Sequence, residues 1–301
     1  MGREVARAAD VGRPPGLITL LTDFGTADGY VAAMKGVIAC RAPEARVVDI
    51  THEIPPHDIR RGGFVWGSAW PWFPPGTIHV AVVDPGVGSA RAIIALKTRR
   101  GIFLAPDNGI LAYAVERRDV RSAVSVESSE HRLEPTSATF HGRDIFAPAA
   151  AALAMGTPID DLGPRVELRA LVWPARARAR RRTTLDVIEW RGEVVDVDRF
   201  GNVTTNIPAP ESGVIDAFEL EVARTTIRGL RRAYAEVEPG ELLVLVGSSG
   251  WVEVAVSGGS AARVLGIERG EGVRVRYRER PPRGRPRLTP RGPGRGRRGP
   301  R

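Results

Sequence analysis

A carboxylate and a guanidinium lie seven residues apart in the segment VAVVDPGVGSAR, residues 80–91. Four β-prone residues precede Asp84, and a proline and two glycines follow it, which predicts a buried strand that ends in a tight loop. Open α/β sheets place their ligands at this end of their strands. Asp84 and Arg91 are therefore candidate residues of a functional site.

Three further polar clusters contain residue types that bind or catalyse: TDFGTADGY (22–30), THEIPPHD (51–58) and TFHGRD (139–144). The first two follow predicted strands, and the third precedes an alanine-rich helix. If the strands are parallel, the clusters open at one edge of the sheet. We then expect one crevice to be surrounded by Asp23, Asp28, His57, Asp84, Arg91 and His141.

The same residue types also have structural roles in proteins. An aspartate after a strand often closes a turn or caps a helix, and Asp28 could cap a helix that begins near Gly29. His52, beside a loop with two prolines, is expected at the surface. The segment PGVGS has neither the Walker spacing nor a GxGxxG pattern, so a phosphate loop is not favoured. No HxH, HExxH or DxD spacing supports a metal site.

A separate cluster, DRFGNVTTN (198–206), combines an acid, an aromatic ring and two carboxamides around one glycine. One interpretation is a hairpin turn with Gly201 at positive φ. The other is a binding site, because Phe200 offers a stacking face and Asn202 offers both a donor and an acceptor to an adenine-like ring.

The secondary structure that positions these residues is predicted to follow two different patterns along the chain. Strands alternate with helices at first, which predicts an α/β layered domain with a mostly parallel sheet. From Thr183 short strands alternate with turns, which predicts a smaller all-β, barrel-like domain. The expected organisation is a loose leader (1–16), an α/β catalytic domain (17–173), an Arg/Ala-rich linker (174–182), a β-barrel domain (183–278) and a disordered tail rich in Arg, Pro and Gly (279–301).

The charge of the chain is unevenly distributed. The formal net charge of the 301 residues is +9, and residues 278–301 alone contain ten arginines and one glutamate. If the linker arginines are also excluded, the net charge of the remaining folded part is mildly negative. Nucleic acid binding is therefore expected only through the tail.

The single cysteine, Cys40, cannot form an intramolecular disulfide. With no signal peptide and no apolar run near the about 18 residues of a membrane helix, we expect a cytoplasmic protein that is not in a membrane.

Seven segments in order resemble one family. They are TDFGTADGYVAAMKG, DITHEIPPHDI, VVDPGVGSAR, APDNG, TFHGRDIFAPAAA, DRFGNVTTNI and SGWVEVAVSGGSAARVLG, and they run from about residue 17 to about residue 277. Together they resemble the S-adenosylmethionine (SAM) hydroxide adenosyltransferases, the hydrolytic relatives of the fluorinase and chlorinase. The resemblance implies an α/β domain followed by a β-barrel, and a homotrimer whose sites form between neighbouring subunits.

The resemblance also implies roles for individual residues. Asp84, Arg91 and His141 are similar to the set that serves the attacking water or hydroxide. Asp23 would bind the ribose hydroxyls, and Asp28 the ammonium group of the methionine moiety. From the neighbouring subunit, Asp198 would also meet the methionine end, while Phe200 and Asn202 would contact adenine. Ser260 departs from the family pattern, which usually has an asparagine there, and Trp251 is left out of the site.

Two positions separate the hydrolases from the halogenases in this family. The halogenases resemble this sequence but carry a tyrosine or a small residue at the place of Asp84, and the fluorinase has a serine at the place of Gly142. The expected function is therefore hydrolysis of SAM to adenosine and methionine, with SAM as substrate and without a cofactor or metal. The alternatives are a SAM-dependent halogenase and a non-catalytic protein that binds nucleotides or RNA.

Overall fold

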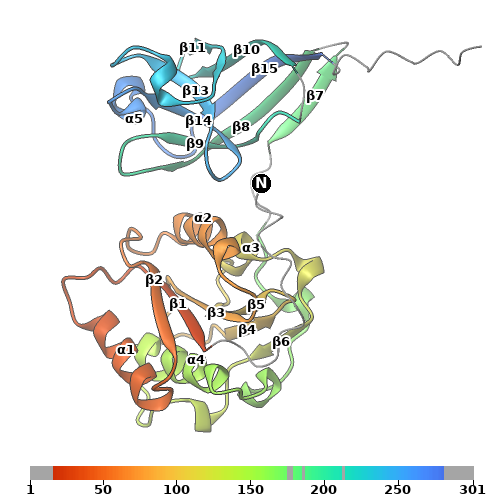
Figure 1. Ribbon diagram of the computed structural model, residues 1–301. Coiled ribbons are helices and arrows are strands. Elements are labelled where there is room, and N and C mark those ends of the chain that lie inside the picture. The colour runs from red at the N-terminus through yellow and green to blue at the C-terminus, as the bar shows by residue number, and fades with distance from the viewer. Residues whose placement is uncertain (1–15, 175–178, 185–186, 212–213, 281–301) are drawn as a thin grey trace, which may run out of the picture. The chain divides into compact units, whose positions relative to one another are not determined.

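The computed structural model describes residues 16–174, 179–184, 187–211 and 214–280, and the chain divides into two compact units, 1–176 and 177–301 (Figure 1). The expected leader lies outside the described residues except for Gly16. The expected tail also lies outside them from residue 281 onward, whereas Glu279 and Arg280 end a strand.

The N-terminal unit is built around a six-stranded sheet with the order β2-β1-β3-β5-β4-β6. Strands β1, β2, β3 and β5 are parallel, while β4 is antiparallel to both of its neighbours. The predicted α/β domain with a mostly parallel sheet is confirmed. Its elements are β1 (Leu17–Thr22), α1 (Tyr30–Arg41), β2 (Arg46–Thr51), α2 (Ile59–Ala69), β3 (Thr77–Val82), β4 (Ile93–Lys97), β5 (Gly101–Pro106), α3 (Leu111–Ala114), β6 (Ser122–Ser125) and α4 (Ala147–Ala154), with a π-helical turn at Gly142–Phe146.

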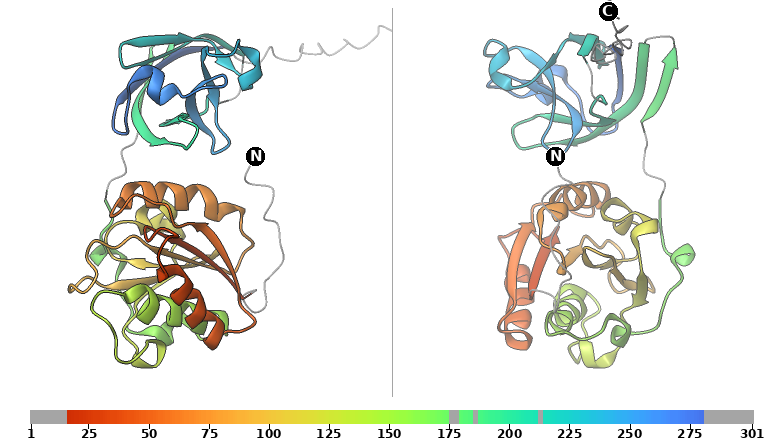
Figure 2. Two further views of the ribbon diagram at one scale, coloured as in Figure 1. Left: turned by 90° about the vertical axis from the view of Figure 1, so that its left-hand side faces the viewer. Right: turned by 45° about the vertical axis from the view of Figure 1, so that its right-hand side comes forward.

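Helices cover both faces of this sheet, as the two views of Figure 2 show. Alternate residues of β1 point to opposite faces, so that Leu20 joins the core under α1 and α4, and Leu21 joins the core under α2 and α3. Met34 of α1 and Trp66 of α2 are fully buried in these two cores. Burial on both faces explains why β1 reads as a continuous apolar run rather than an alternating one.

The C-terminal unit is a nearly closed, mostly antiparallel barrel. Its strand order is β11-β10-β15-β8-β9-β14-β13-β12, with β7 paired to β8. Gly229, at φ 83°, is the single residue between β11 and β12, so the two ends of the strand order meet in the chain. The elements are β7 (Arg180–Thr184), β8 (Val187–Val197), β9 (Val203–Pro208), β10 (Val214–Val222), β11 (Thr225–Arg228), β12 (Leu230–Arg231), β13 (Leu242–Val246), β14 (Trp251–Val256), α5 (Ala261–Leu265) and β15 (Gly272–Arg280).

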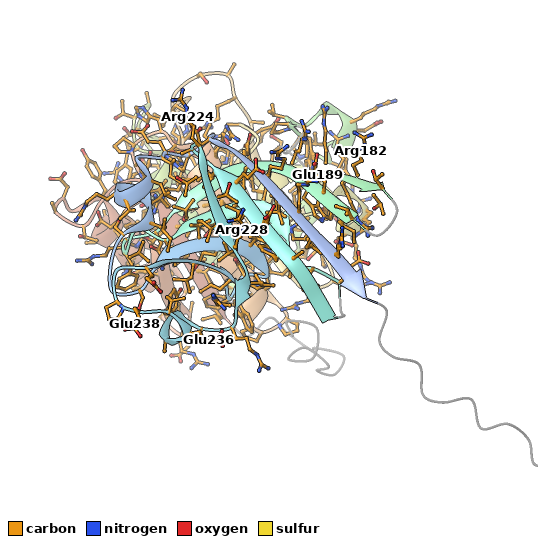
Figure 3. All side chains as sticks on the ribbon, turned by 90° about the horizontal axis from the view of Figure 1, so that it is seen from above. Arg182, Glu189, Arg224, Arg228, Glu236 and Glu238 are labelled. Atoms are coloured by element: carbon orange, nitrogen blue, oxygen red, sulfur yellow. The ribbon has the colours of Figure 1, made fainter. Side chains whose placement is uncertain are left out.

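The segment 180–182, expected within a solvated linker, is the first part of β7. Its arginine side chains are exposed, but its backbone pairs with β8, and Arg182 lies opposite Glu189 (Figure 3). Composition indicates solvent exposure correctly here, but it does not reveal that an edge strand satisfies its backbone hydrogen bonds through a neighbour. None of the described helices combines the length and the apolar character that crossing a membrane requires.

Candidate active site

Asp84, Arg91 and His141 form one hydrogen-bonded group at the carboxyl end of β3. Arg91 Nε donates to both carboxylate oxygens of Asp84, at 3.0 and 2.9 Å, and Arg91 Nη2 donates to Oδ2 as well. The same Nη2 lies 2.9 Å from Nδ1 of His141. Because a guanidinium can only donate, His141 Nδ1 is the acceptor, and the neutral imidazole carries its proton on Nε2.

The loop between Asp84 and Arg91 is turned back by short-range hydrogen bonds and by a glycine in the left-handed region. Val87 N donates to Asp84 O at 3.2 Å, and the hydroxyl of Ser89 donates to Gly86 O at 2.7 Å. Gly88 has φ +78°, and a Cβ there would lie 2.4 Å from the carbonyl oxygen of Ala138. The loop thus fits against the segment that precedes His141 only because residue 88 has no side chain.

His141 is held by the turn that follows it. The π-helical turn begins at Gly142, and Asp144 within it is fully buried. Its carboxylate accepts the Ser137 N–H at 2.8 Å and the Arg143 Nε–H at 2.6 Å. Burial opposes ionisation of Asp144, but these hydrogen bonds outweigh it and lower the pKa of the carboxyl below its ordinary value. Asp144 therefore ties the segment 137–144 together beside the imidazole.

The environment of His141 favours its neutral form. Partial burial lowers the pKa of the imidazole, and the positive charge of Arg91 lowers it further, while Asp84 and Asp144 act in the opposite direction. The net effect is a pKa below the ordinary 6.5. At neutral pH His141 is therefore in its neutral form.

The loops after β1 and β2 contact each other through backbone and side chain. Asp23 Oδ2 accepts the N–H of His57, an exposed residue at φ 66°, at 2.8 Å. Gly25 N donates to His52 O at 2.8 Å. Asp28 is exposed ahead of α1 and does not cap that helix, whose N-cap, Gly29, makes no side-chain hydrogen bond. The structure thus joins Asp23 to His57 by a hydrogen bond.

The expectation that His52 lies at the surface is wrong. The side chain is buried, with Nδ1 2.9 Å from the hydroxyl of Thr22 and Nε2 3.1 Å from Asp49 Oδ1. Lys35 donates to the other oxygen of Asp49 at 2.6 Å. This chain of contacts fixes the end of β1 just before Asp23. The prolines that suggested exposure lie further along the same loop, at positions 55 and 56.

Residue 142 lies among large side chains. A Cβ on Gly142 would be 3.1 Å from the Phe24 ring, 3.2 Å from the sulfur of Met34 and 3.3 Å from the Phe140 ring. The rings of Phe24 and Phe140 also contact each other and Tyr30. A serine at this position would have to displace at least one of these groups.

In the C-terminal unit, the turn 198–202 is organised by Asp198. Its Oδ1 accepts the N–H groups of Phe200 and Asn202 at 2.9 and 2.8 Å, and its Oδ2 accepts Asn202 Nδ2 at 2.9 Å. Gly201 has φ +86°, and a Cβ there would lie 1.9 Å from Ser260 Oγ. The expected hairpin turn and the candidate binding residues are therefore the same structure, in which Phe200 is left 76% exposed.

A pocket of about 500 Å³ opens beside this turn. Phe200 and Asn202 line it together with Ser260 and with parts of the segment 256–259. Tyr234 and Arg263, which the sequence did not single out, also line it. Tyr234 donates its hydroxyl to Glu253 at 2.9 Å. Glu253 was detectable in principle, because it is the one acid in the apolar strand WVEVAV, whereas nothing in the sequence marks Tyr234.

Both partners of this hydrogen bond have shifted pKa values. Burial, followed by the carboxylate of Glu253, raises the pKa of Tyr234 to about 12. Burial also raises the pKa of Glu253, although the hydrogen bond from Tyr234 opposes that shift, and the charge of Asp198 acts in the same direction as burial. At neutral pH the phenol of Tyr234 therefore keeps its proton and donates the hydrogen bond.

Among the residues that the structure describes, no group of three or more His, Cys, Asp or Glu side chains could hold a metal ion.

Comparison with protein families finds two matches that together span most of the chain. Residues 18–163 match the SAM hydroxide adenosyltransferase N-terminal domain, and residues 192–274 match the C-terminal domain of the same family. The (R)-S-adenosyl-L-methionine hydrolase of Salinispora tropica is 43% identical over 87% of this chain and 98% of its own length. The protein of the same name from Thermus thermophilus is 40% identical over 86% of this chain and 98% of its own. A fluorinase from Nocardia brasiliensis is 27% identical over 88% of this chain and 98% of its own.

Solved structures also resemble this chain. An uncharacterized conserved protein from Thermotoga maritima is 37% identical, with a TM-score of 0.77 over 86% of this chain and 99% of that one. A conserved hypothetical protein from Thermus thermophilus is also 37% identical, with a TM-score of 0.69 over 88% of this chain and 100% of that one. The similarity therefore covers both units.

Proposed function

The chain belongs to the SAM hydroxide adenosyltransferase family, and we therefore propose that it hydrolyses SAM to adenosine and L-methionine. The observation that carries the proposal is the contact of Arg91 with both Asp84 and His141, which brings a carboxylate, a guanidinium and an imidazole together beside the end of β3.

The proposed reaction is an in-line displacement at C5′ of the ribose. The water oxygen forms a bond to C5′ as the bond from C5′ to the sulfonium sulfur breaks, and the electron pair of that bond stays on sulfur. The leaving group is the neutral thioether of methionine, so it needs neither a proton nor a Lewis acid. The water releases one proton, and the protein acts on this nucleophile.

The tautomer of His141 determines which residue donates a hydrogen bond to the attacking water and which residue accepts the water proton. With Nδ1 occupied by Arg91, the neutral imidazole can only donate, from Nε2, to the water oxygen. The Asp84 carboxylate is then the acceptor for the water proton, and Arg91 fixes its orientation. In this assignment His141 orients the nucleophile, and Asp84 receives the proton before solvent removes it.

We propose further contacts between the substrate and the other candidate residues. One oxygen of Asp23 accepts the His57 N–H, and we propose that the other oxygen binds the ribose hydroxyls. Asp28 and Asp198 supply negative charge for the ammonium group of methionine. Asn202 holds Asp198 with one amide hydrogen and keeps its other hydrogen and its oxygen for adenine, against which Phe200 would stack.

Two observations support hydrolysis over halogenation. A carboxylate at position 84, held by Arg91, would repel a halide anion but accepts a hydrogen bond from water. An added Cβ at Gly142 would lie 3.1–3.3 Å from Phe24, Met34 and Phe140, so a serine there would require at least one of these side chains to shift slightly. The relatives named hydrolases are also more similar to this chain than the relatives named fluorinases.

The test is to incubate the full-length protein with SAM in water labelled with ¹⁸O and to separate the products by chromatography. We expect equal amounts of adenosine and methionine, the label in the 5′-hydroxyl of adenosine, and unchanged rates with a chelator. Asp84→Asn, purified in the same way, is the matched control for contaminating activity. Formation of 5′-deoxy-5′-haloadenosine with added halide, and no adenosine without it, would show that the protein is a halogenase.

We further propose a cytoplasmic homotrimer, in which the N-terminal unit of one subunit and the C-terminal unit of its neighbour complete each site. This assembly is supported by the family resemblance and by the placement of the candidate residues on two separate units. Light scattering after size-exclusion chromatography measures the subunit number. A monomer that hydrolyses SAM at full rate would contradict the assembly without affecting the activity.

A further inference from the structure

We propose that His52 is a positioning residue of the N-terminal unit, acting through the hydroxyl of Thr22 on the loop 22–25. The inference rests on the proposed function, because this loop carries Asp23, the proposed contact of the ribose. Its direct observation is a chain of hydrogen bonds from a buried imidazole to the loop. Nδ1 of His52 lies 2.9 Å from Oγ1 of Thr22, and the same oxygen accepts the N–H of Phe24 at 3.2 Å.

The direction of these hydrogen bonds follows from the groups present. Asp49 Oδ1 lies 3.1 Å from Nε2 of His52, off the axis of an N–H bond there, and its negative charge favours the proton on Nε2. Nδ1 is then an acceptor, and the Thr22 hydroxyl donates to it. The hydroxyl oxygen keeps its lone pairs for the Phe24 N–H. The imidazole, the hydroxyl and the amide are thus fixed together.

The chain of hydrogen bonds is shielded from water at the loop and charged at its other end. Thr22 is fully buried and His52 is 4% exposed, so solvent cannot readily replace a lost partner. At the outer end Lys35 donates to Asp49 Oδ2 at 2.6 Å. Burial opposes ionisation of Asp49, but the contacts with Lys35 and His52 outweigh it and hold the pKa of the carboxyl below its ordinary value. The carboxylate therefore stays charged beside the imidazole at neutral pH.

The first residue that the loop positions is Asp23. Thr22 ends β1 opposite Val82 of β3, two residues before Asp84. Asp23 follows Thr22 directly, and one of its oxygens accepts the His57 N–H at 2.8 Å. The Thr22 hydroxyl is therefore a buried anchor one residue before Asp23. A shift of this anchor changes the position of Asp23 relative to Asp84.

The second residue that the loop positions is Phe24, whose ring packs beside the segment of the catalytic histidine. The rings of Phe24 and Phe140 pack edge to face with their centroids 5.9 Å apart, and Phe140 directly precedes His141. Because Thr22 holds the Phe24 N–H, a displacement of the loop reaches His141 through these close-packed rings. His52 thus influences both substrate binding and catalysis through one loop.

The same strand contains a second pair of identical chemistry, which provides a matched control. Thr19 Oγ1 lies 2.9 Å from Nδ1 of His79, and both residues are buried. Thr19 pairs with His79 between β1 and β3, three residues before Thr22. Thr19→Val therefore removes a buried hydrogen bond between a hydroxyl and an imidazole, but outside the loop 22–25. If the role of Thr22 were structural only, valine would have equal consequences at the two positions.

The main experiment measures kcat and KM for SAM in the full-length protein, beside a thermal melt. We expect Thr22→Val to lower kcat/KM at least about tenfold, with losses in both kcat and KM, since a shift near 1 Å costs about 10²-fold. Thr22→Ser keeps the hydroxyl and should stay within about threefold of wild type. Thr19→Val should lose a similar number of degrees of Tm but keep kcat/KM within about twofold. His52→Asn, whose amide oxygen can accept the Thr22 hydroxyl, should be more active than His52→Leu.

Hydrogen exchange followed by mass spectrometry reports on the loop without any turnover. The N–H of Phe24 donates to Thr22 Oγ1, and the N–H of Gly25 donates to the carbonyl of His52 at 2.8 Å. A peptide that contains these amides should exchange faster in Thr22→Val than in wild type or in Thr19→Val. Equal exchange in the three proteins, or equal kcat/KM in the two valine variants, would overturn the proposal.

A measurement on the wild-type protein does not depend on the folding of a variant. NMR of protein labelled with ¹⁵N in histidine distinguishes the two neutral tautomers of the imidazole. We expect the proton of His52 on Nε2. A proton on Nδ1 would reverse the hydrogen bond to Thr22, and that result would overturn the proposal.

These outcomes are separable from a failure of the proposed function. If wild-type protein produces no adenosine from SAM, the hydrolase assignment fails, while hydrogen exchange and NMR still decide whether His52 and Thr22 hold the loop. If wild-type protein hydrolyses SAM and Thr22→Val matches Thr19→Val in kcat/KM, only the positioning role is wrong.

Discussion

Gly88→Ala is expected to reduce kcat about a hundredfold, because the loop from Asp84 to Arg91 fits only without a side chain at position 88. The added Cβ would lie 2.4 Å from Ala138 O, whereas carbon and carbonyl oxygen approach to about 3.3 Å. One of the two loops must therefore move by about 0.9 Å. A displacement near 1 Å of a catalytic group costs about 10²-fold in rate.

The same substitution also places alanine at φ +78°, which costs about 1–2 kcal/mol of folding free energy. Gly156→Ala is the matched control, because Gly156 has φ +99° and an added Cβ there would have nothing within 4 Å. Both variants should lose a few degrees of Tm, but only Gly88→Ala should lose activity. The assay is the initial rate of adenosine formation with saturating SAM, beside a thermal melt. A Gly88→Ala protein with kcat within about threefold of wild type would refute the reasoning.

Other predictions concern the histidine, the turn at Gly201 and the buried acid. Because burial and Arg91 lower the pKa of His141, the neutral form should persist on acidification, and kcat/KM should fall only below pH 6.5; an acid limb centred at or above 6.5 would contradict this. If His141 acts as a donor, His141→Gln should retain clearly more kcat than His141→Ala, and equal losses would argue for a proton acceptor. Gly201→Ala, whose Cβ would meet Ser260 Oγ at 1.9 Å, should weaken adenosine binding at least about tenfold, measured by calorimetry, while a variant that binds normally would show that the turn is not rigid. Asp144→Leu leaves its backbone and arginine partners unsatisfied and should lower the free energy of unfolding by about 3 kcal/mol in a denaturant titration; a loss below about 0.5 kcal/mol would mean that water replaces the carboxylate.

The layered architecture was predictable because local patterns encode it. A continuous apolar run such as β1 requires cover on both faces, and the alternation in β15, with Val273 and Val275 inside and Arg274 outside, requires a one-sided sheet. The position of β7 was not predictable from exposed arginines, because strand pairing depends on a neighbour's backbone. Composition cannot distinguish a solvated linker from an exposed edge strand.

The candidate site divides in the same way between sequence and structure. The residue types and their order show which side chains follow each predicted strand. If the strands are parallel, Asp23 and Asp84 lie at the same edge of the sheet. The contact of Arg91 with His141, the burial of His52 and the reach of Tyr234 to Glu253 became visible only in the folded chain. A local pattern specifies a face and a period, whereas a contact between distant segments also needs the strand order, the register and the path of the loops between them.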